Sequence, residues 1–280
     1  MNRLSPDRQA AVVRCLVEGN SIRATVRMTG AAKNTVTKLL VELGEACMAY
    51  LGGHIRDIRA RRVQCDEIWS FVGCKQDNLP DEERGQFGRG DVWTWTALDA
   101  DTKLMISWAV DNRTARAAED FINDLRSRLA TKVQLTTDGQ KVYLDAVDIA
   151  FGPQVDYAML VKVYGDESQA EKRYSPAVCV ASRKEPIIGN PDPKHISTSY
   201  VERQNLTMRM SMRRFTRLTN AFSKKVWNHG CAVALHFMHY NFARPHQSLK
   251  NPYPRTPAMA AGLTDHVWTV EEIVGLLNPN

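Results

Sequence analysis

This 280-residue chain has no long hydrophobic run and no closely paired cysteines, and its last third contains a long stretch without acidic side chains. Its longest mostly apolar stretch runs from Cys231 to Met238, far short of the ~20 residues that a membrane-spanning helix needs. No apolar signal-peptide core follows Met1. These absences predict a chain that has no membrane partner and no secretory leader.

The cysteine pattern excludes two further classes of protein. Six cysteines are present, but none forms a CxxC pair, so spacing alone predicts neither a disulfide framework nor a zinc site. This usage is typical of a reducing compartment, and we expect a cytoplasmic protein. The 44% of hydrophobic and 24% of charged residues exclude wholesale disorder and fibrous repeats.

The net charge of +6 is unevenly distributed along the chain. Residues 1–62 hold 11 Lys and Arg against 5 Asp and Glu, residues 63–202 hold 16 against 23, and residues 203–280 hold 10 against 3. Between Arg203 and Lys250 there are nine basic residues and no acid. This asymmetry favours a polyanionic partner for the two ends and a different task for the middle. Ordinary solvated helix faces are the alternative explanation.

The first 60 residues have the pattern of three helices. Ser5-Pro6 is typical of a helix start, Ser21 begins a short second helix, and Thr29-Gly30 forms a turn before a third helix at about 32–43. This order predicts a helix-turn-helix domain that binds double-stranded DNA through the exposed start of its last helix. The candidate DNA contacts there are Lys33, Asn34, Thr35, Thr37 and Lys38. A three-helix bundle with a polar face is the alternative.

The acidic middle has the pattern of a mixed sheet. Strand-like runs occur at 63–72, 92–98, 104–110, 133–137 and about 157–163. Thr114 begins a helix between the third and fourth runs, and another helix begins near Gln140. We therefore expect an α/β ribonuclease H-like mixed sheet with flanking helices over residues 61–250, preceded by the all-α domain of residues 1–60. Residues 165–199, rich in proline, are predicted to form a loop or insertion, and residues 251–280 a C-terminal tail.

Three acids occupy places in these elements that suit metal chemistry. Asp66 lies mid-strand, where a buried carboxylate is costly unless a divalent cation compensates it. Asp138 ends the fourth strand, where α/β sheets present ligands, and Glu202 opens a helix. Each also has an ordinary explanation: a salt bridge, a turn or a helix-start charge. Glu67 is a rival to Asp66, but neighbouring strand residues face opposite sides, so we expect only one of them at a shared site.

The basic segment begins with a helix from about Ser199. Glu202, Asn205, Arg209 and Arg213 recur at intervals of three and four, which predicts one shared helix face. This face would place a metal beside phosphate-binding groups. The DNA contacts expected from this segment are Arg203, Asn205, Arg209 and Arg213.

Three blocks of the sequence resemble a known family. They are residues 65–73 (CDEIWSFVG), 137–139 (TDG) and 200–209 (YVERQNLTMR). Together they resemble the DDE transposases of bacterial insertion elements, most closely the insertion-sequence-one branch. Residues 220–224 and 240–246 resemble the carboxy-terminal stretch of that family, and the resemblance covers most of residues 20–260.

The resemblance implies a ribonuclease H-like core that cuts element ends and joins them to target DNA. It implies that Asp66, Asp138 and Glu202 are the catalytic acids and the ligands of Mg²⁺ or Mn²⁺. In a two-metal site two ions about 4 Å apart activate the attacking oxygen and stabilise the leaving one. We also expect a homo-oligomer in the DNA complex. Family members often begin with a cysteine-rich zinc-binding segment; here the first predicted helix follows Met1 almost directly, and no such segment is expected.

Two other functions stay open at the level of sequence. A transcriptional regulator would use a helix-turn-helix in residues 1–45 and the remainder as an effector or dimerisation domain. A host-recruited ribonuclease H-like nuclease would keep the three acids but lack strand transfer.

Overall fold

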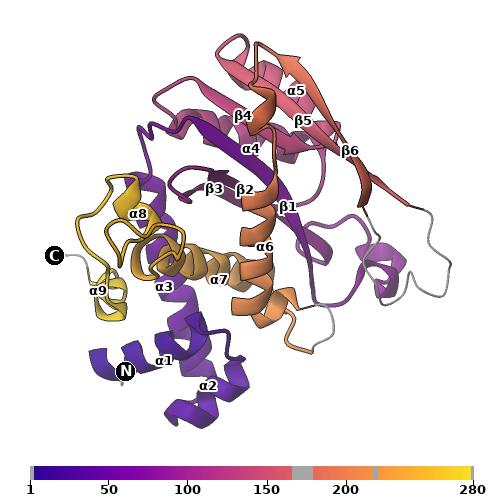
Figure 1. Cartoon of the computed structure of the whole chain (residues 1–280). Helices are drawn as coiled ribbons and strands as arrows, with labels where there is room; N and C mark the ends of the chain where they lie inside the picture. The colour runs from indigo at the N-terminus through magenta and orange to yellow at the C-terminus, as the bar shows by residue number, and fades with distance from the viewer. Residues whose placement is uncertain (1–2, 166–178, 217–219, 279–280) are drawn as a thin grey trace.

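A six-stranded mixed sheet forms the centre of the molecule (Figure 1). The computed structural model of the chain describes residues 3–165, 179–216 and 220–278. The strand order is β3-β2-β1-β4-β5-β6. The strands are β1 (Arg62–Val72), β2 (Gly90–Asp99), β3 (Met105–Asp111), β4 (Val133–Asp138), β5 (Val155–Tyr164) and β6 (Cys179–Ile188).

The sheet contains both antiparallel and parallel pairs of strands. β1, β2 and β3 form an antiparallel meander, whereas β4 and β5 run parallel to β1 and to each other. β6 returns antiparallel along β5. The expected mixed α/β sheet with flanking helices is confirmed, and its order and directions are compatible with a ribonuclease H-like fold.

Helices cover both faces of the sheet. On β2 and β3, Trp95 lies opposite Ala109 and Thr96 opposite Trp108, so the two tryptophans point to opposite faces. Trp95 contacts α4 (Ala115–Arg128) and α5 (Val142–Phe151), whereas Trp108 contacts α7 (Val226–Met238) on the other face. α6 (Ser199–Ser211) packs on β1 and β2. The hydroxyl of Thr114 accepts a hydrogen bond from the Ala117 amide and caps α4, as the sequence predicted.

Three helices precede the sheet in the predicted order. They are α1 (Pro6–Val17), α2 (Ile22–Thr29) and α3 (Lys33–His54). Ser21 caps α2 by accepting from the Ala24 amide, and Gly30 makes the turn with φ of +66°, which suits glycine. α3 does not end near residue 43 but continues to His54, with Cys47 and Leu51 extending its buried face. Gly44 lets its backbone approach α7 closely, since an added Cβ would lie 2.6 Å from Cys231 Cα.

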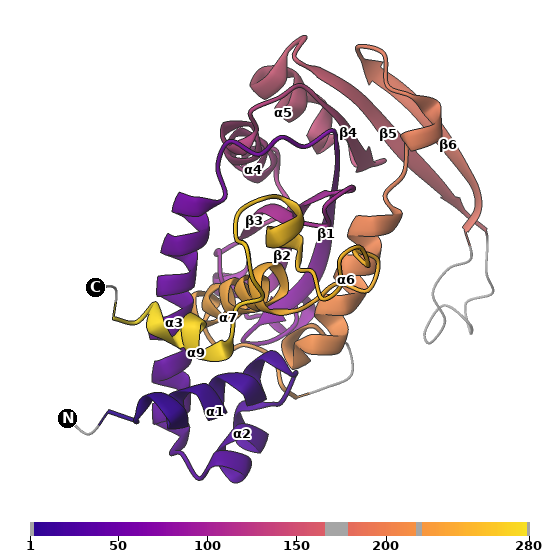
Figure 2. The same ribbon diagram turned by 60° about the vertical axis from the view of Figure 1, so that its left-hand side comes forward.

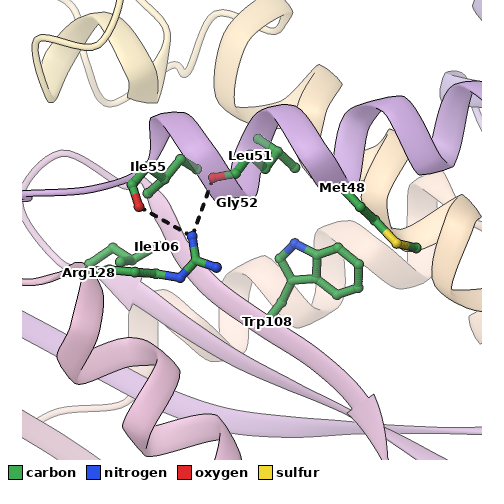
Figure 3. Close-up of a pocket in the computed structure, with 7 residues that line it drawn as sticks. All are labelled: Met48, Leu51, Gly52, Ile55, Ile106, Trp108 and Arg128. Atoms are coloured by element: carbon green, nitrogen blue, oxygen red, sulfur yellow. Dashed lines mark hydrogen bonds between the residues drawn. The ribbon is translucent and has the colours of Figure 1, made fainter.

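The far end of α3 is attached to the sheet. The Arg128 guanidinium of α4 donates to the carbonyls of Leu51 and Ile55, at 3.3 and 3.2 Å, and satisfies the last turn of α3 (Figure 3). Beside this contact lies a small cavity of about 80 Å³. Its lining residues are Met48, Leu51, Gly52, Ile55, Ile106, Trp108 and Arg128. α3 is therefore one continuous helix that links the N-terminal helices to α4 and the neighbouring strand β3.

The predicted loop over residues 165–199 is partly a strand. Residues 179–188 form β6, and Pro193–His195 form a 3₁₀ helix, while 166–178 lie outside the described residues. The prolines favoured a loop because proline cannot donate a ladder hydrogen bond. Pro186 is nevertheless accommodated at a register shift on β6, which is the edge strand.

The last 30 residues contain two short helices, of which the first packs on the turn that ends α7 and the second on α1 (Figure 2). A π-helical turn (His239–Ala243) ends α7, and α8 (Pro257–Ala260) and α9 (Val270–Gly275) follow. Arg14 of α1 pairs with Glu271 of α9, and the Arg3 guanidinium donates to the Asn278 side chain at 3.0 Å. The predicted tail is thus ordered against α1. No helix in the described ranges is long and apolar enough to cross a membrane.

Candidate active site

Asp66, Asp138 and Glu202 line one cavity of about 460 Å³. The sheet register explains the meeting of the first two: Gln64 of β1 pairs with Thr136 of β4, and each acid lies two residues further along its own strand on the same face. Glu202 comes from the first turn of α6, which packs on β1. The rest of the lining consists of Gly139, Gln140, Leu160, Val161 and Lys162.

The side chain of Gln64 fixes the start of α6 on the sheet. Its Oε1 accepts hydrogen bonds from the backbone amides of Tyr200 and Val201, at 2.9 and 3.1 Å. These two amides belong to the first turn of the helix and have no intrahelical partner of their own. This contact places Glu202 beside the strand that carries Asp66.

Asp66 is held through both of its carboxylate oxygens. Oδ1 accepts from the backbone amide of Glu67, and Oδ2 accepts from the Asn205 side-chain amide, each at 2.9 Å. The pKa of Asp66 is raised to about 7, first by burial and then by the carboxylates of Asp138 and Glu67. An acid in this state lacks positive compensation, which a bound cation would supply.

Glu67 also approaches this group, which corrects the expectation that only one of the two neighbouring acids could. Carboxylate oxygens of Asp66, Glu67 and Asp138 lie within 4.8 Å of one another. The two side chains do leave β1 on opposite faces, since Asp66 meets α6 and Glu67 meets Tyr143 of α5. Asp138 ends its strand, however, and the end of a strand can be reached from either face.

A cation fixes Glu67 on its side of the sheet. Arg113 contacts the Glu67 carboxylate at 2.9 Å and that of Asp138 at 3.8 Å, and its guanidinium stacks over the Trp93 ring. Burial raises the pKa of Glu67, and Asp138 adds to the rise, whereas Arg113 opposes it. Burial also raises the pKa of Asp138. The sequence reasoning missed Arg113, which no motif marks.

Glu202 is held by two donors. Its Oε1 accepts from the Lys162 ammonium of β5 and from the Thr198 hydroxyl just before α6. Among the described residues, the 4.8 Å group comprises Asp66, Glu67 and Asp138 and does not include Glu202. Lys162 was also missed, although a single lysine within the apolar run of residues 157–163 is a signal that could have identified it.

The donor set fits a hard divalent cation. The ligand atoms are all carboxylate oxygens, which Mg²⁺ and Mn²⁺ prefer. Glu67 is compensated by Arg113 and by the Tyr143 hydroxyl, which acts as a hydrogen-bond donor and opposes the rise that burial causes in its pKa. Asp66 has no such compensation, since burial and the carboxylates of Asp138 and Glu67 raise its pKa, so the group is suited to hold a positive ion.

The basic face predicted on α6 is only partly present. Arg203, a predicted DNA contact outside that face, is exposed. Asn205 of the face is 7% exposed and holds Asp66 rather than facing solvent. Arg209 turns its guanidinium to the Phe215 carbonyl at 3.1 Å. Arg213 does not share the helix face, because α6 ends at Ser211 and residue 212 is extended; Arg213 lies exposed in the following 3₁₀ turn.

The predicted contacts on α3 gather at its first turns. Lys33 and Asn34 are exposed, and Thr35 is half-buried. Thr37 donates its hydroxyl to the Lys33 carbonyl, and Lys38 forms a 3.5 Å ion pair with Glu42. In Figures 1 and 2 this end of α3 lies with α1 and α2 beyond the sheet, away from β6.

Comparisons with known proteins give little. No family model matches the sequence, and no curated protein matches it. The crystal structure of the Mos1 strand transfer complex is 11% identical with a TM-score of 0.23, the match covering 86% of this chain and 77% of that one. The crystal structure of a pre-cleavage Mos1 transpososome is 10% identical with a TM-score of 0.25, over 85% and 78% of the two chains.

Proposed function

We propose that this protein is a DNA transposase, which binds the ends of an insertion element and performs metal-dependent strand cleavage and strand transfer. One observation carries the proposal: Asp66, Asp138 and Glu202, three acids from distant parts of the sequence, line one cavity on a sheet of compatible topology.

The residues of the chain prepare the cavity for phosphodiester chemistry. Two bound Mg²⁺ or Mn²⁺ ions would activate the attacking oxygen and stabilise the leaving one. Asn205 and the amide of residue 67 orient Asp66, so that its charge stays directed into the cavity. Thr198 and Lys162 hold the Glu202 carboxylate in the lining of the same cavity. Asp66, Asp138 and Glu202 are the proposed metal ligands.

The DNA would be held on both sides of this cavity. We assign residues 1–60 as a helix-turn-helix reader of element ends, with the exposed start of α3 in the major groove. Residues 61–250 form the catalytic domain and residues 251–280 a C-terminal segment. A homo-oligomer in the cytoplasm would bring two element ends to one target, and Arg203 would contact phosphate beside the cavity.

Neutralising a single acid should separate DNA binding from chemistry. In Asp138→Asn and in Glu202→Gln we expect cleavage and joining to fall by at least about 10³-fold, as for loss of one member of a catalytic unit. Duplex affinity should change little, because neither carboxylate is a phosphate contact. Purified protein is incubated with Mg²⁺, a supercoiled plasmid and a labelled duplex from the flanks of the gene, and fluorescence anisotropy measures binding.

The matched control is Asp120→Asn, an exposed acid on α4 that pairs with Arg116 away from the cavity. It should leave both activities intact. Retained strand transfer in either active-site variant would remove that acid from the mechanism. Wild-type protein that only nicks DNA would instead be a nuclease, and protein that binds DNA without cutting would be a regulator.

A further inference from the structure

The cavity contains a cation, Lys162, that contacts one of the proposed metal ligands. Lys162 projects from β5 and its ammonium contacts Oε1 of Glu202. Burial raises the pKa of Asp138, and the same ammonium is one of the groups that oppose this rise, so its charge acts on both acids. It lies among the acids proposed to hold a divalent ion, and two cations cannot both pair closely with one carboxylate oxygen without repelling each other.

The ion pair between Lys162 and Glu202 is partly exposed to solvent. The side chains of Lys162 and Glu202 are 27% and 39% exposed, and both belong to the wall of the cavity. Ion pairs at such positions are screened by water and are weak. A divalent ion entering from solvent therefore has access to the Glu202 carboxylate.

The other cation of the site, Arg113, is about as exposed as Lys162, at 30% against 27%, but the acid that it pairs with is buried. The Glu67 side chain paired with Arg113 is 0% exposed, and the Arg113 guanidinium is stacked on Trp93. Breaking a buried pair leaves an uncompensated charge and costs several kcal/mol. Arg113 is thus a fixed part of the site, while the Glu202 carboxylate that Lys162 contacts is reached by solvent.

We propose that Lys162 is a displaceable internal counter-ion, which occupies the Glu202 carboxylate and competes with the divalent cation for it. This rests on the proposed role of Glu202 as a metal ligand. Lys162 is then a positioning residue that acts through Glu202: it holds the acid in place before the metal arrives and weakens metal binding by its charge. The free energy needed to displace Lys162 sets the divalent-cation concentration at which Glu202 becomes a metal ligand.

The test measures metal binding without DNA. Free Mn²⁺ is titrated by electron paramagnetic resonance against the full-length wild type and Lys162→Met, which keeps the side-chain length and removes the charge. We expect Mn²⁺ to bind on the order of tenfold more tightly to Lys162→Met, because a nearby positive charge is lost. Lys162→Arg, which keeps the charge, should bind close to wild type.

The control is Lys132→Met, since Lys132 pairs with Asp156 at the opposite ends of β4 and β5 and should leave the affinity unchanged. Thermal unfolding of each variant shows that it is folded. Unchanged or weaker Mn²⁺ binding in Lys162→Met overturns the inference, as does the absence of binding in both proteins. Tighter binding in a protein that never cuts DNA would support the inference while the transposase proposal fails.

Discussion

At the scale of single residues, a buried histidine is built into the fold as a neutral group. His229 is fully buried, with Nδ1 2.9 Å from Ser223 Oγ and Nε2 3.2 Å from Ser70 Oγ. Arg214 donates to the same Ser223 oxygen, so we assign the Ser223 proton to Nδ1 and the imidazole proton to Nε2. The basic segment thus includes Arg214 as an internal donor rather than as part of the positive surface.

This histidine should make the fold sensitive to acid. Burial, and then Arg214, lower the pKa of His229 to about 3, against about 6.5 in an unfolded chain. Its contribution to stability is full above pH 6.5 and is lost as the pH falls toward 3, because only the unfolded state takes up the proton. Between pH 7.5 and 5 this costs about 2 kcal/mol of unfolding free energy. In His229→Gln, urea unfolding at the two pH values should show a pH-dependent loss smaller by that amount.

The other buried histidines are present in both proteins, so the comparison isolates this one. An equal loss between the two pH values in His229→Gln would show that His229 is not held neutral.

That Asp66, Asp138 and Glu202 line one cavity agrees with the sequence, whereas the groups that surround them could not be predicted from it. Asp66 lies in the middle of a strand, where a carboxylate is unusual, and Asp138 lies at the end of a strand. Each position can be recognised from its own segment of sequence. Arg113 and Lys162 matter only because strands far apart in the sequence become neighbours. The spacing of Asn205 correctly places it on the same face of α6 as Glu202. Whether its amide contacts DNA or Asp66 depends on how closely α6 packs on β1.

At the scale of elements, local rules explain most of the helices and strands but do not explain α3, which packs closely on α7. Strand runs and helix caps follow local rules, and Thr114 and Ser21 cap as expected. The length of α3 does not follow these rules. Gly44 is a poor helix former, but its lack of a side chain lets α3 approach α7 closely. β6 was missed for a similar reason: its pairing with β5 is a tertiary contact that local proline signals oppose.

A pair of glycine substitutions in α3 tests this packing. Gly44→Ala should lower the free energy of unfolding by about 1–3 kcal/mol, because its Cβ would lie 2.6 Å from the Cα and the carbonyl oxygen of Cys231. Gly52→Ala in the same helix meets nothing within 4 Å and should raise stability by about 0.5–1 kcal/mol through helix propensity. Urea unfolding of the three proteins measures both. Stabilisation by Gly44→Ala would contradict the close approach of α3 and α7.

At the scale of the whole molecule, the net charge of +6 combines two basic ends with an acidic middle. The structure shows that part of the basic charge is used internally. Arg14 pairs with Glu271, Arg62 with Asp101, and Arg209 donates to a backbone carbonyl. The charge available to DNA is therefore smaller than the sequence count suggests, while Lys33 and Arg203 stay exposed in the two basic segments.

Salt dependence of DNA binding tests this distribution. Each phosphate contact releases counterions, so the logarithm of the binding constant falls with the logarithm of salt concentration by about 0.9 per contact. The double variant Lys33→Ala, Arg203→Ala should reduce this slope by about 2. Lys132→Ala, which removes a charge paired with Asp156 in the acidic middle, should not change it. Anisotropy titrations of a labelled duplex between 50 and about 200 mM salt give the slopes. A wild-type slope near zero, or an equal reduction in the control, would mean that the basic ends do not hold DNA.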